Sequence, residues 1–97
     1  MIYHSLWLSG KGSLLRSALV KRRRSTARLV RQLRNRLGLT QEEFAARLGV
    51  TFPTINRWEN ARANPSPLAL KRIEELLVGL GHRGQDLRAK YFGGKDT

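Results

Sequence analysis

The chain has 97 residues, which is enough for one small domain and too few for two. It contains no cysteine, so disulfide frameworks and thiolate metal sites are excluded. No apolar run approaches the roughly 20 residues that span a bilayer, and we expect no membrane partner. The net charge of +12, from 19 Lys/Arg against 7 Asp/Glu, favours a polyanionic partner, nucleic acid first.

Residues 1–24 are expected to form a basic N-terminal arm, partly disordered or helical. The arm holds six basic residues and no acid, which is half of the charge excess of the whole chain. Its first residues show no basic region before their apolar patch, and we expect no signal peptide. Ser13 is a candidate cap for a helix that then meets the basic run. Two interpretations of this run stay open: a solvated charged face, or phosphate contacts made by Arg22, Arg23 and Arg24.

Residues 25–81 are expected to form the folded domain, and a helix opens it. Ser25 or Thr26 either restarts the helix of the arm or continues it. From there apolar residues recur at a spacing of 3.6 residues, which predicts a helix as far as Leu37. Gly38 follows and ends this helix.

A short helix is predicted next, over residues 41–48. Thr40 and Glu43 match the pattern of a capping box. In this box the threonine hydroxyl accepts from the Glu43 N–H, and the carboxylate accepts from the Thr40 N–H. Gly49 stands where the end of the helix needs a positive φ, which glycine adopts without strain.

A second short helix is predicted over residues 52–60. Thr51 is its candidate cap, and Pro53 lies in its first turn, where the missing N–H costs little. Ile55 and Trp58 give this helix an apolar inward face. A helix, a glycine turn and a second helix with polar and basic outward residues is the layout of a DNA-reading helix-turn-helix.

A leucine-rich helix is predicted to follow a polar loop and to close the core. Ser66 and Pro67 supply its cap and its first position, and Gly81 ends it. Its leucines are numerous enough that an exposed remainder offers a contact surface for a partner chain. The apolar stripe consists of Leu68, Leu70, Ile73, Leu76, Leu77 and Leu80. The tail, residues 82–97, is expected to add one short helix at most.

The segment LGLTQEEFAARLGVTFPTINRWEN resembles the lambda-repressor-like (Cro/Xre-type) helix-turn-helix family. The resemblance covers about residues 27–80. It implies an all-α fold, a compact bundle of four to five short helices, with the basic arm as an N-terminal extension. The family usually carries glycine at the position of Ala61, so a left-handed backbone conformation is energetically less favourable there.

The N-terminal half of the second short helix is expected to read base edges in the major groove. Arg57 is the strongest candidate, because a guanidinium pairs bidentately with guanine O6 and N7. Phe52 and Pro53 cannot hydrogen-bond a base but can pack on a thymine methyl group; Phe52 can also fold back onto the domain. The full set of candidates for base contact is Thr51, Phe52, Pro53, Thr54, Asn56 and Arg57.

The resemblance also implies residues that hold the DNA backbone. Gln41 resembles the family glutamine that contacts a phosphate, and Asn60 resembles a second backbone contact. Arg62 is a plausible third. Arg34 and Glu59 match positions that form an internal salt bridge, so they are assigned to structure rather than to DNA binding.

The leading hypothesis is a sequence-specific regulator of transcription that binds double-stranded DNA, of the repressor type. We expect a homodimer on a palindromic site, in the cytoplasm and associated with the nucleoid. An alternative is an antitoxin that binds its own operator and masks a toxin protein. For this the candidate docking segments are residues 6–8 and Tyr91–Phe92. A third hypothesis is a nonspecific basic binder.

We expect neither an enzyme nor a cofactor. His4 and His82 are isolated, and no acidic pair accompanies a nucleophile at a recognisable spacing. No metal site is visible for the same reason.

Overall fold

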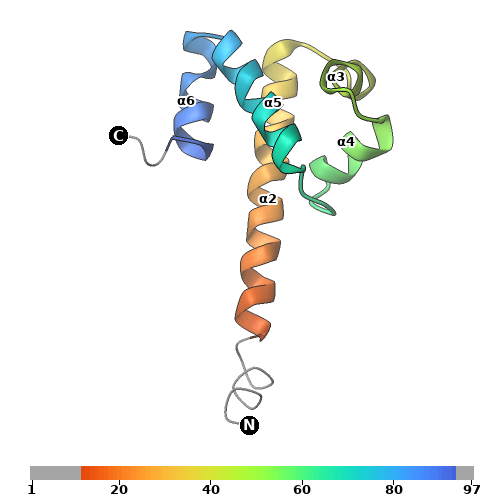
Figure 1. Ribbon diagram of the computed structural model, residues 1–97, viewed down its shortest axis with the longest axis vertical. Coiled ribbons are helices and arrows are strands. Elements are labelled where there is room, and N and C mark those ends of the chain that lie inside the picture. The colour runs from red at the N-terminus through yellow and green to blue at the C-terminus, as the bar shows by residue number, and fades with distance from the viewer. Residues whose placement is uncertain (1–11, 94–97) are drawn as a thin grey trace.

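The computed structural model describes residues 12–93. Within that range the chain is all-α, as expected from the sequence, and forms no strand (Figure 1). The apolar segment at residues 6–8 lies outside the described residues. The elements are α2 (Gly12–Leu37), α3 (Gln41–Leu48), α4 (Phe52–Glu59), α5 (Pro67–Gly79) and α6 (His82–Tyr91).

The first helix, α2, runs unbroken for 26 residues. Of the two options at Ser25 and Thr26, the structure therefore has the continuous helix. From residue 14 to its end α2 contains neither glycine nor proline, and arginine, leucine and alanine are good helix formers. The Thr26 hydroxyl turns back and donates to the Arg22 carbonyl oxygen at 2.9 Å. The N-terminal half of α2 projects away from the other helices (Figure 1).

The core lies where the C-terminal half of α2 meets the other four helices. Phe44 of α3 and Ile55 and Trp58 of α4 point into it, and Ile73 and Leu77 of α5 cover them, as the apolar stripe predicts. Burying these side chains is the main stabilising contribution of the fold. The remaining core residues are Leu29, Val30, Leu33, Ala45, Leu48, Ala69 and Leu87.

The tail folds back as α6 and belongs to the core. Leu87 is buried, and Tyr91 and Phe92 pack on the core from its edge. α6 crosses α5 so closely that a Cβ at Gly84 would overlap the carbonyl oxygen of Leu77. The preceding helix, α5, ends at Gly79, two residues before the expected end at Gly81.

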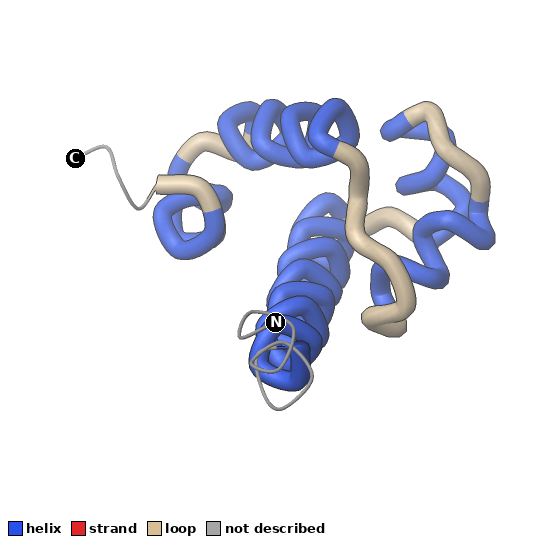
Figure 2. Tube along the Cα trace, turned by 60° about the horizontal axis from the view of Figure 1, so that its bottom comes forward, coloured by secondary structure: helices blue, strands red, loops and turns tan. Residues whose placement is uncertain are grey.

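A pair of charged residues joins α6 to the end of α2. Arg36 donates from Nη1 to Asp86 Oδ1 at 2.5 Å and from Nη2 to Asp86 Oδ2 at 2.9 Å. Arg83 donates to the Arg36 carbonyl oxygen at 2.7 Å. α6 therefore lies on the side of α2 away from α3 and α4, which leaves the outer faces of those two helices uncovered (Figures 1 and 2).

Candidate nucleic-acid interface

The connections of α3 and α4 are set by local hydrogen bonds. The capping box at Thr40 is complete: Glu43 N–H donates to the Thr40 hydroxyl at 3.1 Å, and Thr40 N–H donates to Glu43 Oε1 at 2.9 Å. Gly49 has φ 74° after α3, and Thr51 caps α4 through the Thr54 N–H. These local signals hold the turn between the two helices in one conformation.

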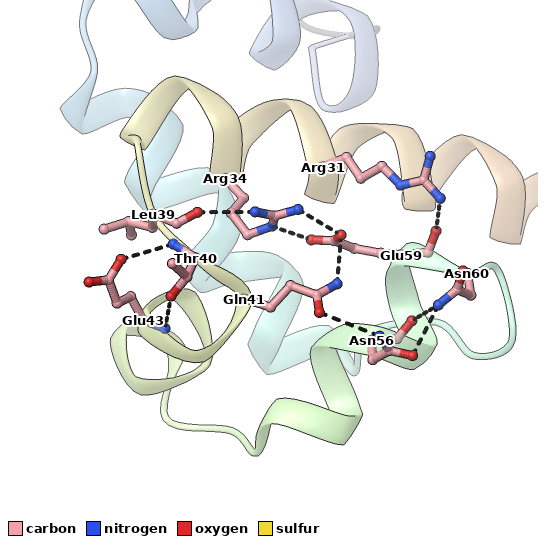
Figure 3. Close-up of polar contacts among 9 residues, drawn as sticks. All are labelled: Arg31, Arg34, Leu39, Thr40, Gln41, Glu43, Asn56, Glu59 and Asn60. Atoms are coloured by element: carbon pink, nitrogen blue, oxygen red, sulfur yellow. Dashed lines mark hydrogen bonds and ion pairs between the residues drawn. The ribbon is translucent and has the colours of Figure 1, made fainter.

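The carboxylate of Glu59 connects three helices (Figure 3). Glu59 is only 4% exposed, and Arg34 of α2 donates to it twice, from Nε at 2.6 Å and from Nη2 at 3.0 Å. This hydrogen bonding raises the pKa of Arg34. Gln41 of α3 donates a third hydrogen bond, from Nε2 to Oε1 at 2.9 Å. The ion pair expected between Arg34 and Glu59 is thus present, and Gln41 adds a third hydrogen bond to the same carboxylate.

Arg34 and Arg31 extend this network along α2. Arg34 Nη1 donates to the Leu39 carbonyl oxygen at 3.0 Å, which ties down the link between α2 and α3. Arg31 Nη2 donates to the Glu59 carbonyl oxygen at 2.7 Å, at the C-terminal end of α4 (Figure 3). A cation at a helix C-terminus is favoured by the helix dipole. The position of α4 is therefore fixed by charge-assisted bonds as well as by its apolar face.

Three of the predicted site residues lie along one edge of α4 (Figure 3). Asn56 Nδ2 donates to Gln41 Oε1 at 3.4 Å, and Asn60 Nδ2 donates to Asn56 Oδ1 at 3.0 Å and to the Asn56 carbonyl oxygen at 2.8 Å. We call Gln41, Asn56 and Asn60 the amide edge. The structure brings two of the predicted phosphate contacts, Gln41 and Asn60, together through Asn56.

The outward side of α4 carries the other predicted base contacts. Phe52 is 42% exposed, so it does not fold back into the core, and Pro53 and Arg57 are exposed as well. The hydroxyls of Thr51 and Thr54 lie 2.8 Å apart and share a hydrogen bond. Phe52, Pro53, Arg57 and Thr51 are therefore exposed to a ligand, whereas Thr54 is half-buried.

The turn after α4 is left-handed at Ala61, with φ 59°. The Ala61 N–H donates to the Trp58 carbonyl oxygen at 3.2 Å, and the Arg62 N–H donates to the Arg57 carbonyl oxygen at 2.9 Å. These two bonds form a Schellman motif, whose central residue is usually glycine. Arg62, two residues after Asn60, is exposed.

The three arm arginines do not share one surface. Successive residues of a helix point about 100° apart. Arg22 and Arg24 are exposed on different sides of α2, and Arg23 is half-buried. Sequence reasoning also passed over Arg28 and Arg31, whose spacing from Arg24 is helical. The helical spacing that joins Arg24 to Arg28 and Arg31 can be recognised only when α2 is known to continue through Ser25.

Comparisons with known proteins bear directly on the α3–α4 unit. A family model described as Helix-turn-helix matches residues 30–77. A regulator from Methanothermobacter thermautotrophicus, named an uncharacterized HTH-type transcriptional regulator, is 49% identical over 49 residues. The match covers 50% of this chain and 71% of that protein. The chain belongs to the helix-turn-helix family. No solved structure gives a significant match.

Family membership makes this helix-turn-helix protein a DNA-binding transcriptional regulator. It also explains the bundle, because the lambda-repressor-like fold is all-α. In the described part of the regulator, no helix combines the length and the apolar character that crossing a membrane requires.

Proposed function

We propose that this regulator is a sequence-specific repressor that reads the major groove with α4. The observation that carries the proposal is the network at Glu59, which holds α4 against α2 and α3 while Phe52, Pro53 and Arg57 face outward. A reading helix must be held rigidly, because base discrimination depends on hydrogen-bond geometry.

Within this proposal each group of residues has a separate role. Arg57 pairs with a guanine, and Phe52 with Pro53 packs on thymine methyl groups. Gln41 and Asn60 of the amide edge contact phosphates, and Arg62 extends that contact. Phosphate contacts set the register of a protein on DNA, whereas base contacts set the sequence that it prefers.

The quaternary arrangement is part of the same proposal. We expect two copies on a palindrome, with half-sites about one helical turn apart. The exposed apolar side chains of α5, Leu68 at 61% and Val78 at 54%, support a contact between copies. Sedimentation of the free protein and of its complex with the selected duplex measures this state directly. The proposed location is the cytoplasm, on the nucleoid.

Of the other hypotheses, the antitoxin has no structural observation in its favour. Of its two docking segments, residues 6–8 are outside the described residues, and Tyr91 and Phe92 pack on the core of their own chain. The hypothesis of a nonspecific basic binder remains, and the experiment must distinguish it from sequence-specific binding. We propose no catalytic reaction for this regulator.

The test is selection of bound duplexes from a random pool at about 150 mM salt, with the wild type and with Arg57→Ala. We expect a palindrome that contains G·C pairs, and a preference relaxed at one position of each half-site by Arg57→Ala. Loss of one bidentate pair corresponds to roughly 1–3 kcal/mol of discrimination. Failure to enrich any sequence would contradict the proposal. A reporter gene behind the selected site then decides between repression and activation.

A further inference from the structure

The middle of α2, from Lys21 to Arg31, carries a regular array of positive charge. Basic residues recur at intervals of three, four and three residues, which is the spacing of one helix side. All four are exposed, and we call them the α2 stripe: Lys21, Arg24, Arg28 and Arg31. In the described residues none of them forms a salt bridge, and α2 itself contains no acid.

One end of the stripe is fixed beside the amide edge. Arg31 donates to the carbonyl oxygen of Glu59, the residue before Asn60. From Arg31 the helix α2 continues toward its N-terminus past the end of α4 (Figures 1 and 3). The spacing of three and four residues keeps the rest of the stripe on the same side of α2 as Arg31. Lys21 lies ten positions before Arg31, so the stripe extends the edge by about 15 Å. The edge and the stripe therefore form one continuous border of the α4 face.

The stripe is electrostatically unfavourable in the free protein. Like charges three and four residues apart on a helix repel one another. No carboxylate of the described chain forms an ion pair with a stripe residue, although Arg34 and Arg36 nearby are both paired with acids. A strand of DNA carries a negative charge every 3.4 Å along its axis and releases counterions when basic residues replace them. Such a ligand removes the repulsion and matches the linear shape of the array.

We propose that the α2 stripe binds the phosphate backbone of the duplex flanking the site read by α4. The contact is independent of sequence and adds to the footprint on the side of Asn60. It rests on the proposed function, because it needs α4 to face the DNA. Of the run Arg22–Arg24, only Arg24 lies on this surface. Arg28, which is outside the run, also contacts a phosphate in this proposal.

The test uses two double variants of the full chain with equal loss of charge. Arg24→Gln/Arg28→Gln empties the middle of the stripe. Arg22→Gln/Lys90→Gln removes one charge from another side of α2 and one from α6, and serves as the matched control. Glutamine keeps a high helix propensity, and circular dichroism checks that both variants fold. Each protein is titrated with the selected duplex, with and without about five extra base pairs on each side, over a range of salt.

On the extended duplex we expect the stripe variant to reduce the slope of log Kobs against log salt by about 2, since each lost phosphate contact removes about 0.9. On the short duplex its slope should match the wild type, and the control should match it on both. Equal effects of the two variants would show that only total charge matters and would overturn the inference. No effect of the stripe variant would overturn it too.

The two proposals fail in distinguishable ways. Base preference is read from the random-pool selection with Arg57→Ala, whereas the stripe is read from the difference between the two charge variants. If no sequence is enriched, the proposed function fails, and the titrations are run on a random duplex instead. Equal slopes for the two variants there would overturn the stripe as well. If a sequence is enriched while the slopes agree, only the stripe is lost.

Discussion

Arg34 and Glu59, 25 positions apart, meet in a two-pronged ion pair in which the carboxylate is 4% exposed. The pair lies under the amide edge, so it holds the side of α4 that we expect to face DNA. A buried pair contributes little compared with an apolar pair of the same shape, but breaking it leaves a buried charge alone.

Arg34→Leu should therefore lower the free energy of unfolding by about 3 kcal/mol. The double variant Arg34→Leu/Glu59→Leu should recover at least half of that loss, because no unpaired carboxylate remains. Urea denaturation of both variants measures the two values. A double variant less stable than the single one would show that the pair stabilises the fold by itself.

The left-handed residue after α4 offers a stabilising change. Ala61 has φ 59°, a conformation that costs an L-residue roughly 1–2 kcal/mol and glycine almost nothing. Glycine also makes the unfolded chain more flexible, so Ala61→Gly should raise stability by about 0.5–1 kcal/mol. For a domain of this size that is a rise of roughly 2–8 °C in Tm.

The matched control for this change is Gly38→Ala. Gly38 has φ 70°, and a Cβ there would meet no atom within 4 Å. The substitution therefore tests the backbone alone and should lower stability by about 1 kcal/mol or more. Thermal melts in which both variants shift Tm in the same direction would contradict this account of the turn.

α5 and α6 cross closely because Gly84 has no side chain. A methyl group at Gly84 would overlap the Leu77 carbonyl oxygen, which is backbone and cannot turn aside. Gly84→Ala should cost about 1–3 kcal/mol, the usual range for overpacking. Gly79→Ala, in the last turn of α5 with open space around it, should be neutral or stabilising by up to about 1 kcal/mol. Similar Tm values for the two variants would show that the close approach of Gly84 to the Leu77 carbonyl oxygen does not limit this crossing.

The contact between α2 and α6 should depend on pH. Hydrogen bonds from Arg36 lower the pKa of Asp86 from 3.8 to about 2. A carboxyl whose folded pKa is depressed contributes stability above its unfolded pKa and loses it as the pH falls toward the folded pKa. The stability difference between wild type and Asp86→Asn should thus be constant above about pH 5 and shrink between about pH 4 and pH 2. A difference that does not change over this window would assign the effect to another group.

Local signals account for the elements that the sequence predicted well. The capping box at Thr40, the glycine at 49 and the cap at Thr51 act within four residues, so the limits of α3 and α4 follow from neighbours along the chain. The family was also readable, because the motif is long and ordered, and the family match confirms it. The base and phosphate contacts stay predictions.

By itself, the sequence determined the all-α class, the helix-turn-helix and the positive charge, since periodicity, caps and composition are properties of short stretches. Only the tertiary structure decided that Gln41 joins Arg34 on Glu59 and that α6 completes the core. It also separated the arm arginines onto different sides of one unbroken helix. The first two depend on contacts between distant segments, which no pattern of neighbouring residues specifies. The third depends on which of the two options at Ser25 the chain takes, and the sequence left both open.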